Sequence, residues 1–152
     1  MRLTLITLLL LISTGISAMA HKLGFAELLD KRNRTDLAPI TLASGQPLAS
    51  APYILKSGGY YRLKIIADGS AELAVEGEAF FRSVWLNEVV INDIEIRPIG
   101  LDSLEFDDEG QAEITFIAIK PGQYELKIPG TKGATQRAVF TIGDPISRMS
   151  KI

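Results

Sequence analysis

Cysteine is absent from the 152-residue chain, and histidine occurs once, as His21. Without a thiolate, the chain cannot form a disulfide, a cysteine nucleophile, a zinc ribbon, an iron–sulfur cluster or a cysteine-ligated copper site. A single histidine also excludes a multi-histidine metal site within one chain. It leaves a Ser-His-Asp relay only one candidate base.

The net charge of the chain is also small. The chain has 16 Lys and Arg against 18 Asp and Glu, which gives a formal net charge of −2. This balance offers no electrostatic reason to expect nucleic acid or an anionic membrane as a partner. The hydrophobic fraction is 47%, enough to fill the core of one domain of this length without disulfides. We therefore expect one folded domain.

Residues 1–20 are typical of a secretory signal peptide. A positive start at Arg2 precedes an apolar run over residues 3–12, and small residues follow up to Ala20. The run is about half the length of roughly 20 residues that a membrane-spanning helix needs, although an uncleaved anchor is the alternative. Cleavage after Ala20, or after Ala18, predicts a periplasmic or secreted protein with no stable membrane insertion after processing.

The pattern of apolar and turn residues divides the rest of the chain into three parts. Residues 21–38 predict a short amphipathic lead-in, residues 39–145 a β-sandwich, and residues 146–152 a tail. From residue 39 onward, short apolar or alternating runs are separated by turn residues, which favours an all-β antiparallel sandwich. The predicted strands cover residues 40–42, 53–55, 60–67, 71–75, 84–96, 103–106, 112–119, 123–128 and 137–142.

Three local features sharpen this prediction. Asp68-Gly69, between two predicted strands, is the strongest hairpin signal, because a type I′ turn needs positive φ at both central residues. The irregular stretch at residues 80–94 predicts a helical turn before a strand at residues 88–96. The alternation over residues 124–128 predicts a half-buried strand at a sheet edge.

The C-terminal half resembles the cupredoxins, the family of plastocyanin and azurin. The resemblance rests on a strand at residues 112–119, a Pro-Gly-x-Tyr corner at residues 121–124, and the strands at residues 125–128 and 136–142. Such corners also occur in immunoglobulin-like sandwiches. The resemblance implies a cupredoxin-like or immunoglobulin-like antiparallel sandwich.

Copper-binding cupredoxins take a Cys, a His and usually a Met from the loop that joins their last two strands. When that loop is laid on this chain without a gap, the Cys position falls on Ile128, the His on Thr131 and the Met on Gln136. None of these residues supplies the thiolate and imidazoles that hold and tune the metal. We therefore expect a sandwich with no type 1 copper site and no bound cofactor.

His21 is the one candidate metal ligand. After cleavage at Ala20, its amine and imidazole would together chelate one copper ion. After cleavage at Ala18, the sequence Met19-Ala20-His21 would offer an amine, two amides and an imidazole to Cu(II) in a square plane. A copper carrier using His21 is therefore the alternative function. The competing interpretation is that His21 is simply the first residue of the mature chain.

Acidic residues gather between residues 102 and 109, where Asp102 and Glu105 precede the run Asp107-Asp108-Glu109. Their oxygens would suit Ca²⁺, but their spacing does not match an EF-hand loop. We interpret the run as a solvated hairpin turn.

Two stretches are candidates for a partner surface. The first is the loop at residues 129–136, where Thr131, Lys132 and the adjacent Arg137 form a small basic tip suited to an acidic partner.

The second stretch is the aromatic group Phe80, Phe81 and Trp85, which either forms an exposed patch or plugs one end of the sandwich. No spacing supports a nucleophile–base pair. The sequence therefore predicts an exported, non-catalytic binding or accessory module that recognises a periplasmic protein.

Overall fold

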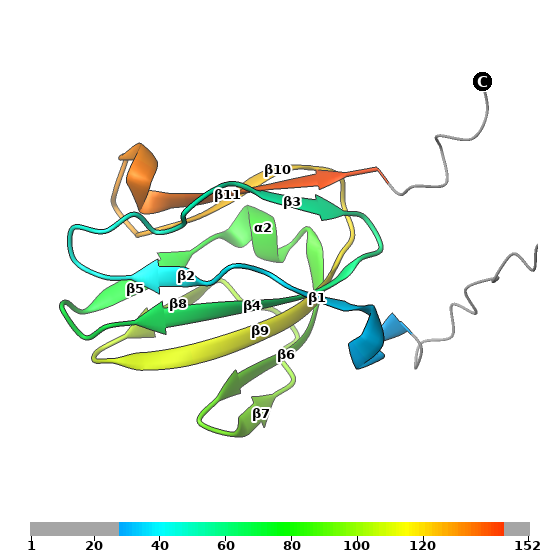
Figure 1. Ribbon diagram of the computed structural model, residues 1–152, viewed down its shortest axis with the longest axis horizontal. Coiled ribbons are helices and arrows are strands. Elements are labelled where there is room, and N and C mark those ends of the chain that lie inside the picture. The colour runs from blue at the N-terminus through cyan, green and yellow to red at the C-terminus, as the bar shows by residue number, and fades with distance from the viewer. Residues whose placement is uncertain (1–27, 145–152) are drawn as a thin grey trace, which may run out of the picture.

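The computed structural model describes residues 28–144 as two β-sheets packed face to face (Figure 1). The predicted signal peptide, the first part of the lead-in and the tail lie outside the described residues. The first sheet has the strand order β1-β4-β9-β6-β7, with β2 also pairing with β4, and the second has the order β3-β11-β10-β5-β8. The predicted all-β sandwich is confirmed.

The element bounds follow the predicted runs closely except for β1, which lies in the predicted lead-in and pairs with β4 of the first sheet. The first sheet contains β1 (Arg34–Asp36), β2 (Ile40–Leu42), β4 (Tyr60–Ala67), β6 (Val84–Ile91), β7 (Ile94–Ile96) and β9 (Gly110–Ala118). The second contains β3 (Tyr53–Lys56), β5 (Leu73–Glu76), β8 (Ser103–Phe106), β10 (Gly122–Lys127) and β11 (Arg137–Gly143). Within residues 28–144 the structure also describes the short helical segments η1 (Lys31–Asn33), α2 (Glu78–Phe81) and η2 (Ala134–Gln136).

The sheets are mixed rather than purely antiparallel. β1 and β2 both run parallel to β4, and β3 runs parallel to β11. The remaining strand pairs are antiparallel. Parallel pairs arise because the chain crosses from the first sheet to the second between β2 and β3 and returns with β4. A crossing of this kind leaves no hairpin to impose an antiparallel partner.

The predicted hairpin at Asp68-Gly69 is wrong. β4 belongs to the first sheet and β5 to the second, so the two strands do not pair. Gly69 has a φ of 73°, but Asp68 is not among the residues of positive φ, so a type I′ turn does not form. Instead the Asp68 carboxylate accepts from Ser70 N–H at 2.9 Å, and Ser70 Oγ accepts from Ser44 N–H at 2.8 Å.

A two-residue hairpin is found elsewhere, at Asn92-Asp93. Their φ values of 47° and 64° are both positive, as a type I′ turn requires. This turn splits the predicted strand at residues 84–96 into β6 and β7, which form the hairpin at the bottom of Figure 1. The predicted helical turn exists, but as α2, before β6.

The core lies between the sheets and is built by alternation. In β9, Ile114 and Phe116 face the core, as predicted. Ile117 on the other face is also buried, whereas Ile119 is exposed, so this strand is covered on both faces only up to its end. The predicted edge strand at residues 124–128 is wrong, because β10 lies between β11 and β5.

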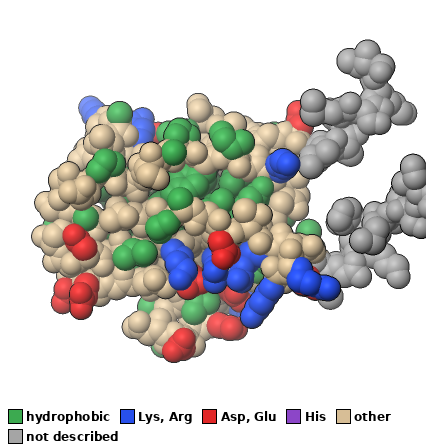
Figure 2. All heavy atoms as spheres, viewed as in Figure 1, with side chains coloured by type: hydrophobic (Ala, Val, Ile, Leu, Met, Phe, Trp, Pro, Cys, Tyr) green, Lys and Arg blue, Asp and Glu red, His purple; other side chains and the backbone are tan. Residues whose placement is uncertain are grey.

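Ion pairs cover part of the outer face of the first sheet. The Arg62 guanidinium bridges Asp36 on β1 and Glu113 on β9, and Lys64 Nζ lies 3.1 Å from Glu113. The hydrogen bond from Arg62 holds the pKa of Asp36 below its ordinary value. Figure 2 shows basic side chains grouped on the surface with acidic side chains beside them. This face is therefore a solvated layer of mutually paired charges.

Candidate functional site

The 129–136 loop is braced from within. Ile128 N–H donates to the Gln136 carbonyl at 3.0 Å, and the Thr131 hydroxyl donates to the Ile128 carbonyl at 2.7 Å. Gly133 N–H donates to Gln136 Oε1 at 3.3 Å. These bonds close the loop on η2 at one end of the sandwich (Figure 1). The loop is a defined surface, not an open connection.

Arg137 holds this loop to the sheet. Its guanidinium donates to the Lys132 carbonyl at 3.1 Å and the Gly133 carbonyl at 3.4 Å, and it pairs with Glu125 at 3.0 Å. Arg137 is therefore half-buried and already engaged. Lys132 is exposed, and no carboxylate of residues 28–144 forms an ion pair with it. Of the predicted basic tip, Lys132 is the cation left for a partner.

A hollow of about 370 Å³ lies beside this loop, and we call it the loop-end hollow. Ile128, Thr131 and Gln136 all line it, together with residues of the turns at 43–47 and 71–73. The structure thus gathers the three positions where the cupredoxin resemblance places Cys, His and Met. Their aliphatic, hydroxyl and amide groups do not match a thiolate-and-imidazole copper set. Within residues 28–144, no three His, Cys, Asp or Glu side chains are grouped to hold a metal ion.

The aromatic stretch is divided by the structure. Phe80 is fully buried and Phe81 is 4% exposed, so of the two predicted alternatives the exposed patch is wrong for these two residues. α2 places Phe80 between the sheets, where the centroid of its ring lies 4.4 Å from that of Phe140 and 5.4 Å from that of Phe116. Trp85 on β6 is 40% exposed. His21, the candidate metal ligand, lies outside the described residues.

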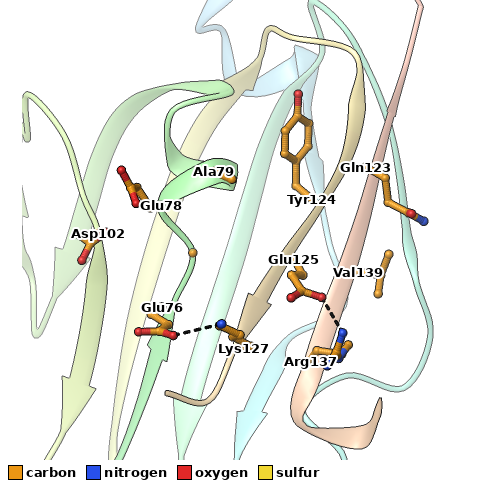
Figure 3. Close-up of a pocket in the computed structure, with 11 residues that line it drawn as sticks. Glu76, Glu78, Ala79, Asp102, Gln123, Tyr124, Glu125, Lys127, Arg137 and Val139 are labelled. Carbon is orange, nitrogen blue, oxygen red and sulfur yellow. Dashed lines mark hydrogen bonds and ion pairs between the residues drawn. The ribbon is translucent and has the colours of Figure 1, made fainter. Parts of the chain in front are cut away.

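Another hollow, of about 640 Å³, lies on the second sheet beside α2 (Figure 3); we call it the α2 hollow. It exists because β5 and β10 pair only at Glu76 and Lys127, and α2 takes the place of a continued strand. Two ion pairs cross its floor. Lys127 Nζ lies 3.5 Å from Glu76, and Arg137 lies 3.0 Å from Glu125.

Glu78 and Asp102 form the side of the α2 hollow nearest α2 and the 97–102 connection (Figure 3). Gly77 N–H donates to the Asp102 carbonyl at 3.1 Å, which ties this connection to the start of α2. In the sequence, Asp102 belongs to the acidic stretch at residues 102–109 and is distant from Glu78. No periodicity in the sequence links the two residues.

Several solved structures of similar fold carry the names of copper enzymes. A multicopper oxidase from Pseudomonas thermotolerans matches 75% of this chain with a TM-score of 0.55 and 14% identity, and the match covers 31% of that protein. A laccase-like multicopper oxidase from Ochrobactrum sp. matches 75% with a TM-score of 0.51 and 9% identity, over 32% of its chain. A copper nitrite reductase from Nitrosomonas europaea matches 62% with a TM-score of 0.48 and 17% identity, over 33% of its chain.

At these identities the likeness concerns the fold alone. The chain has a cupredoxin-like β-sandwich and corresponds to about a third of the length of those proteins. Neither a protein-family model nor a curated protein matches the sequence. Within the described residues, no helix is long and apolar enough to cross a membrane.

Proposed function

We propose that this chain is an exported, non-catalytic binding or accessory module, periplasmic or secreted, which works without a type 1 copper site. Its partner is a protein that docks on the end of the sandwich formed by the 129–136 loop. The observation that carries the proposal is the braced loop, which presents one unpaired cation, Lys132, beside the loop-end hollow.

Each property of this end suits binding. Because the loop is held by its own hydrogen bonds and by Arg137, little conformational entropy is lost when a partner docks. The loop-end hollow offers a partner side chain a neutral recess, since the residues that line it carry no charge. Lys132 is exposed and directly follows the lining residue Thr131, and its charge would orient an acidic partner and speed its association.

The copper-free part of the proposal rests on the donor set. The chain contains no cysteine, and Ile128, Thr131 and Gln136 stand where a copper-binding cupredoxin has its ligands. The non-catalytic part rests on the lining of the loop-end hollow, which has no acid, base or nucleophile positioned against another.

Lys132→Glu is expected to weaken partner capture from a periplasmic extract roughly tenfold, because it places like charge against an acidic surface. Lys120→Glu is the matched control. It reverses the charge of an exposed lysine at the opposite end of β10, so capture of the partner should be unchanged. Capture is measured by quantitative mass spectrometry of the proteins retained by the immobilised chain.

Trp85→Ala belongs in the same experiment because Trp85 is the exposed member of the second candidate surface. Loss of capture with Trp85→Ala but not with Lys132→Glu would move the docking site to β6. An identical set of partners for the wild type and both variants would contradict both surfaces.

The alternative function is a copper carrier that uses His21 at the mature N-terminus. Its support is the predicted cleavage site, which would give His21 or Met19-Ala20-His21 a free amine. This alternative places all metal binding in the first residues of the mature chain. A His21→Ala variant therefore distinguishes it from any site in the sandwich.

A further inference from the structure

A second hollow, of about 620 Å³, adjoins the α2 hollow. Both are lined by Glu78 and Asp102, so these two side chains lie where the hollows meet. The remaining lining of the second hollow includes the apolar side chains Phe81, Val84, Ile99 and Leu101, and we call it the isoleucine hollow. Together the two hollows follow the surface from the outer face of β10, past α2, to the 97–102 connection.

One carboxylate among the charged side chains of these hollows has no partner in an ion pair. Their linings contain four carboxylates and three cations, an excess of one negative charge. Three ion pairs account for the rest: Glu76 with Lys127 at 3.5 Å, Glu125 with Arg137 at 3.0 Å, and Glu78 with Arg82 at 2.7 Å. Asp102 has no ion pair with any residue of the described chain. It is exposed at the junction of the hollows.

The isoleucine hollow also presents apolar side chains to solvent. Ile99 is fully exposed, although it is a large apolar side chain, and Leu101 is half-buried against the core. Covering Ile99 would remove its whole side chain from water, which favours association. An unpaired carboxylate and an uncovered isoleucine therefore lie three residues apart on one connection.

We propose that the two hollows form one groove that binds an extended segment of a partner protein, with a Lys or Arg at Asp102 and an apolar residue over Ile99. Arg137 lies both in the α2 hollow and at the base of the 129–136 loop, but Asp102 and Ile99 lie outside that loop, so the inference goes beyond the proposed function. Charge complementarity selects the basic residue, because every cation of the groove already has a carboxylate and only Asp102 lacks a counter-ion. The apolar neighbour follows from the isoleucine hollow.

An extended segment suits the shape of this groove. Alternate residues of a strand point to the same side and lie about 6.6 Å apart, so a basic residue and an apolar residue two positions away can enter adjoining hollows. Each hollow is within the roughly 300–1,000 Å³ range of established ligand sites. The hydrogen bond from Gly77 to the Asp102 carbonyl holds the groove's two walls together before binding.

The probe is an array of immobilised hexapeptides with valine at alternating positions and Lys, Arg, Glu or Ser at a central position. The full processed chain is applied to the array, and the best peptide is then labelled and titrated by fluorescence anisotropy. Peptides with Lys or Arg two positions from a valine should retain the protein, and those with Glu or Ser at that central position should not. Retention that ignores the charge, or no retention at all, would overturn the proposal.

Variants locate the binding on the groove. Asp102→Asn and Ile99→Ser should each weaken binding of the labelled peptide about tenfold, because one removes the counter-ion and the other the apolar cover. Glu105→Gln and Ile54→Ser are the matched controls, since they change an exposed carboxylate and an exposed isoleucine outside both hollows, and they should leave binding unchanged.

Equal losses in the test and control variants would contradict the groove, as would binding that Lys132→Glu abolishes while Asp102→Asn spares it. The last result would place the peptide at the 129–136 loop. Failure of the groove and failure of the proposed function are therefore distinguishable, because the two depend on different variants.

Discussion

Replacing Phe80 with alanine is expected to lower the free energy of unfolding by about 3–5 kcal/mol. The Phe80 ring is fully buried and contacts Phe140, Phe116 and Phe81 between the two sheets. Removing it leaves a cavity that the surrounding strands cannot fill without moving. The measurement is urea unfolding of the wild type and the variant, followed by circular dichroism.

Ile54→Ala is the control for this prediction. Ile54 is 75% exposed on the outer face of β3, so its loss should change the free energy of unfolding by less than about 0.5 kcal/mol. If Phe80→Ala cost no more than Ile54→Ala, α2 would not insert an aromatic ring between the sheets. The description of this end of the core would then be contradicted.

Replacing Gly77 with alanine should lower the free energy of unfolding by about 1–3 kcal/mol through overpacking. A Cβ on Gly77 would overlap Leu126 Cδ2 and lie 2.9 Å from the Glu125 carbonyl oxygen. The φ of Gly77 is −179°, so backbone strain does not contribute and the effect is a steric clash. The variant would push α2 away from β10 and alter the wall of the α2 hollow.

Gly100→Ala is the matched substitution, because a Cβ there would meet no atom within 4 Å. Its free energy of unfolding should stay within about 0.5 kcal/mol of the wild type. Equal losses for the two variants would show that close packing of Gly77 on β10 is not what requires glycine there.

Strand positions were largely predictable because each strand carries its own burial pattern. β4 and β8 match the predicted runs at residues 60–67 and 103–106 at both ends. In β4, buried and half-buried residues alternate after Tyr61, which is the pattern that a strand packed on one face produces. Local sequence contains this information, since it depends only on which face of the strand is covered.

Strand pairing was less predictable, because it depends on which sheet receives each strand. Asp68-Gly69 has the composition of a tight hairpin, but β4 and β5 are drawn to opposite sheets by different neighbours, β9 and β10. Conversely, Asn92-Asp93 has no glycine and still forms a two-residue turn, because Asn and Asp tolerate positive φ. The composition of a turn therefore does not by itself predict which strands pair as a hairpin.

In the candidate sites, too, local features were predictable from the sequence and contacts between distant segments were not. The cupredoxin resemblance pointed to the 129–136 loop, which is a local feature, and the structure places Ile128, Thr131 and Gln136 around one hollow. The clamping role of Arg137 depends on Glu125 across the strand pair, and the groove depends on Asp102 meeting Glu78. Contacts between distant segments leave no periodic signal in a single sequence.

The proposal that this cupredoxin-like sandwich works without type 1 copper is tested most directly by a Cu(II) titration of the processed chain. Visible absorption and electron paramagnetic resonance follow the bound metal, and His21→Ala is titrated in parallel. We expect no intense copper–thiolate band and no site tighter than micromolar in either protein. Tight binding abolished by His21→Ala would favour the copper carrier instead. A tight copper site that persists in His21→Ala would contradict a copper-free sandwich.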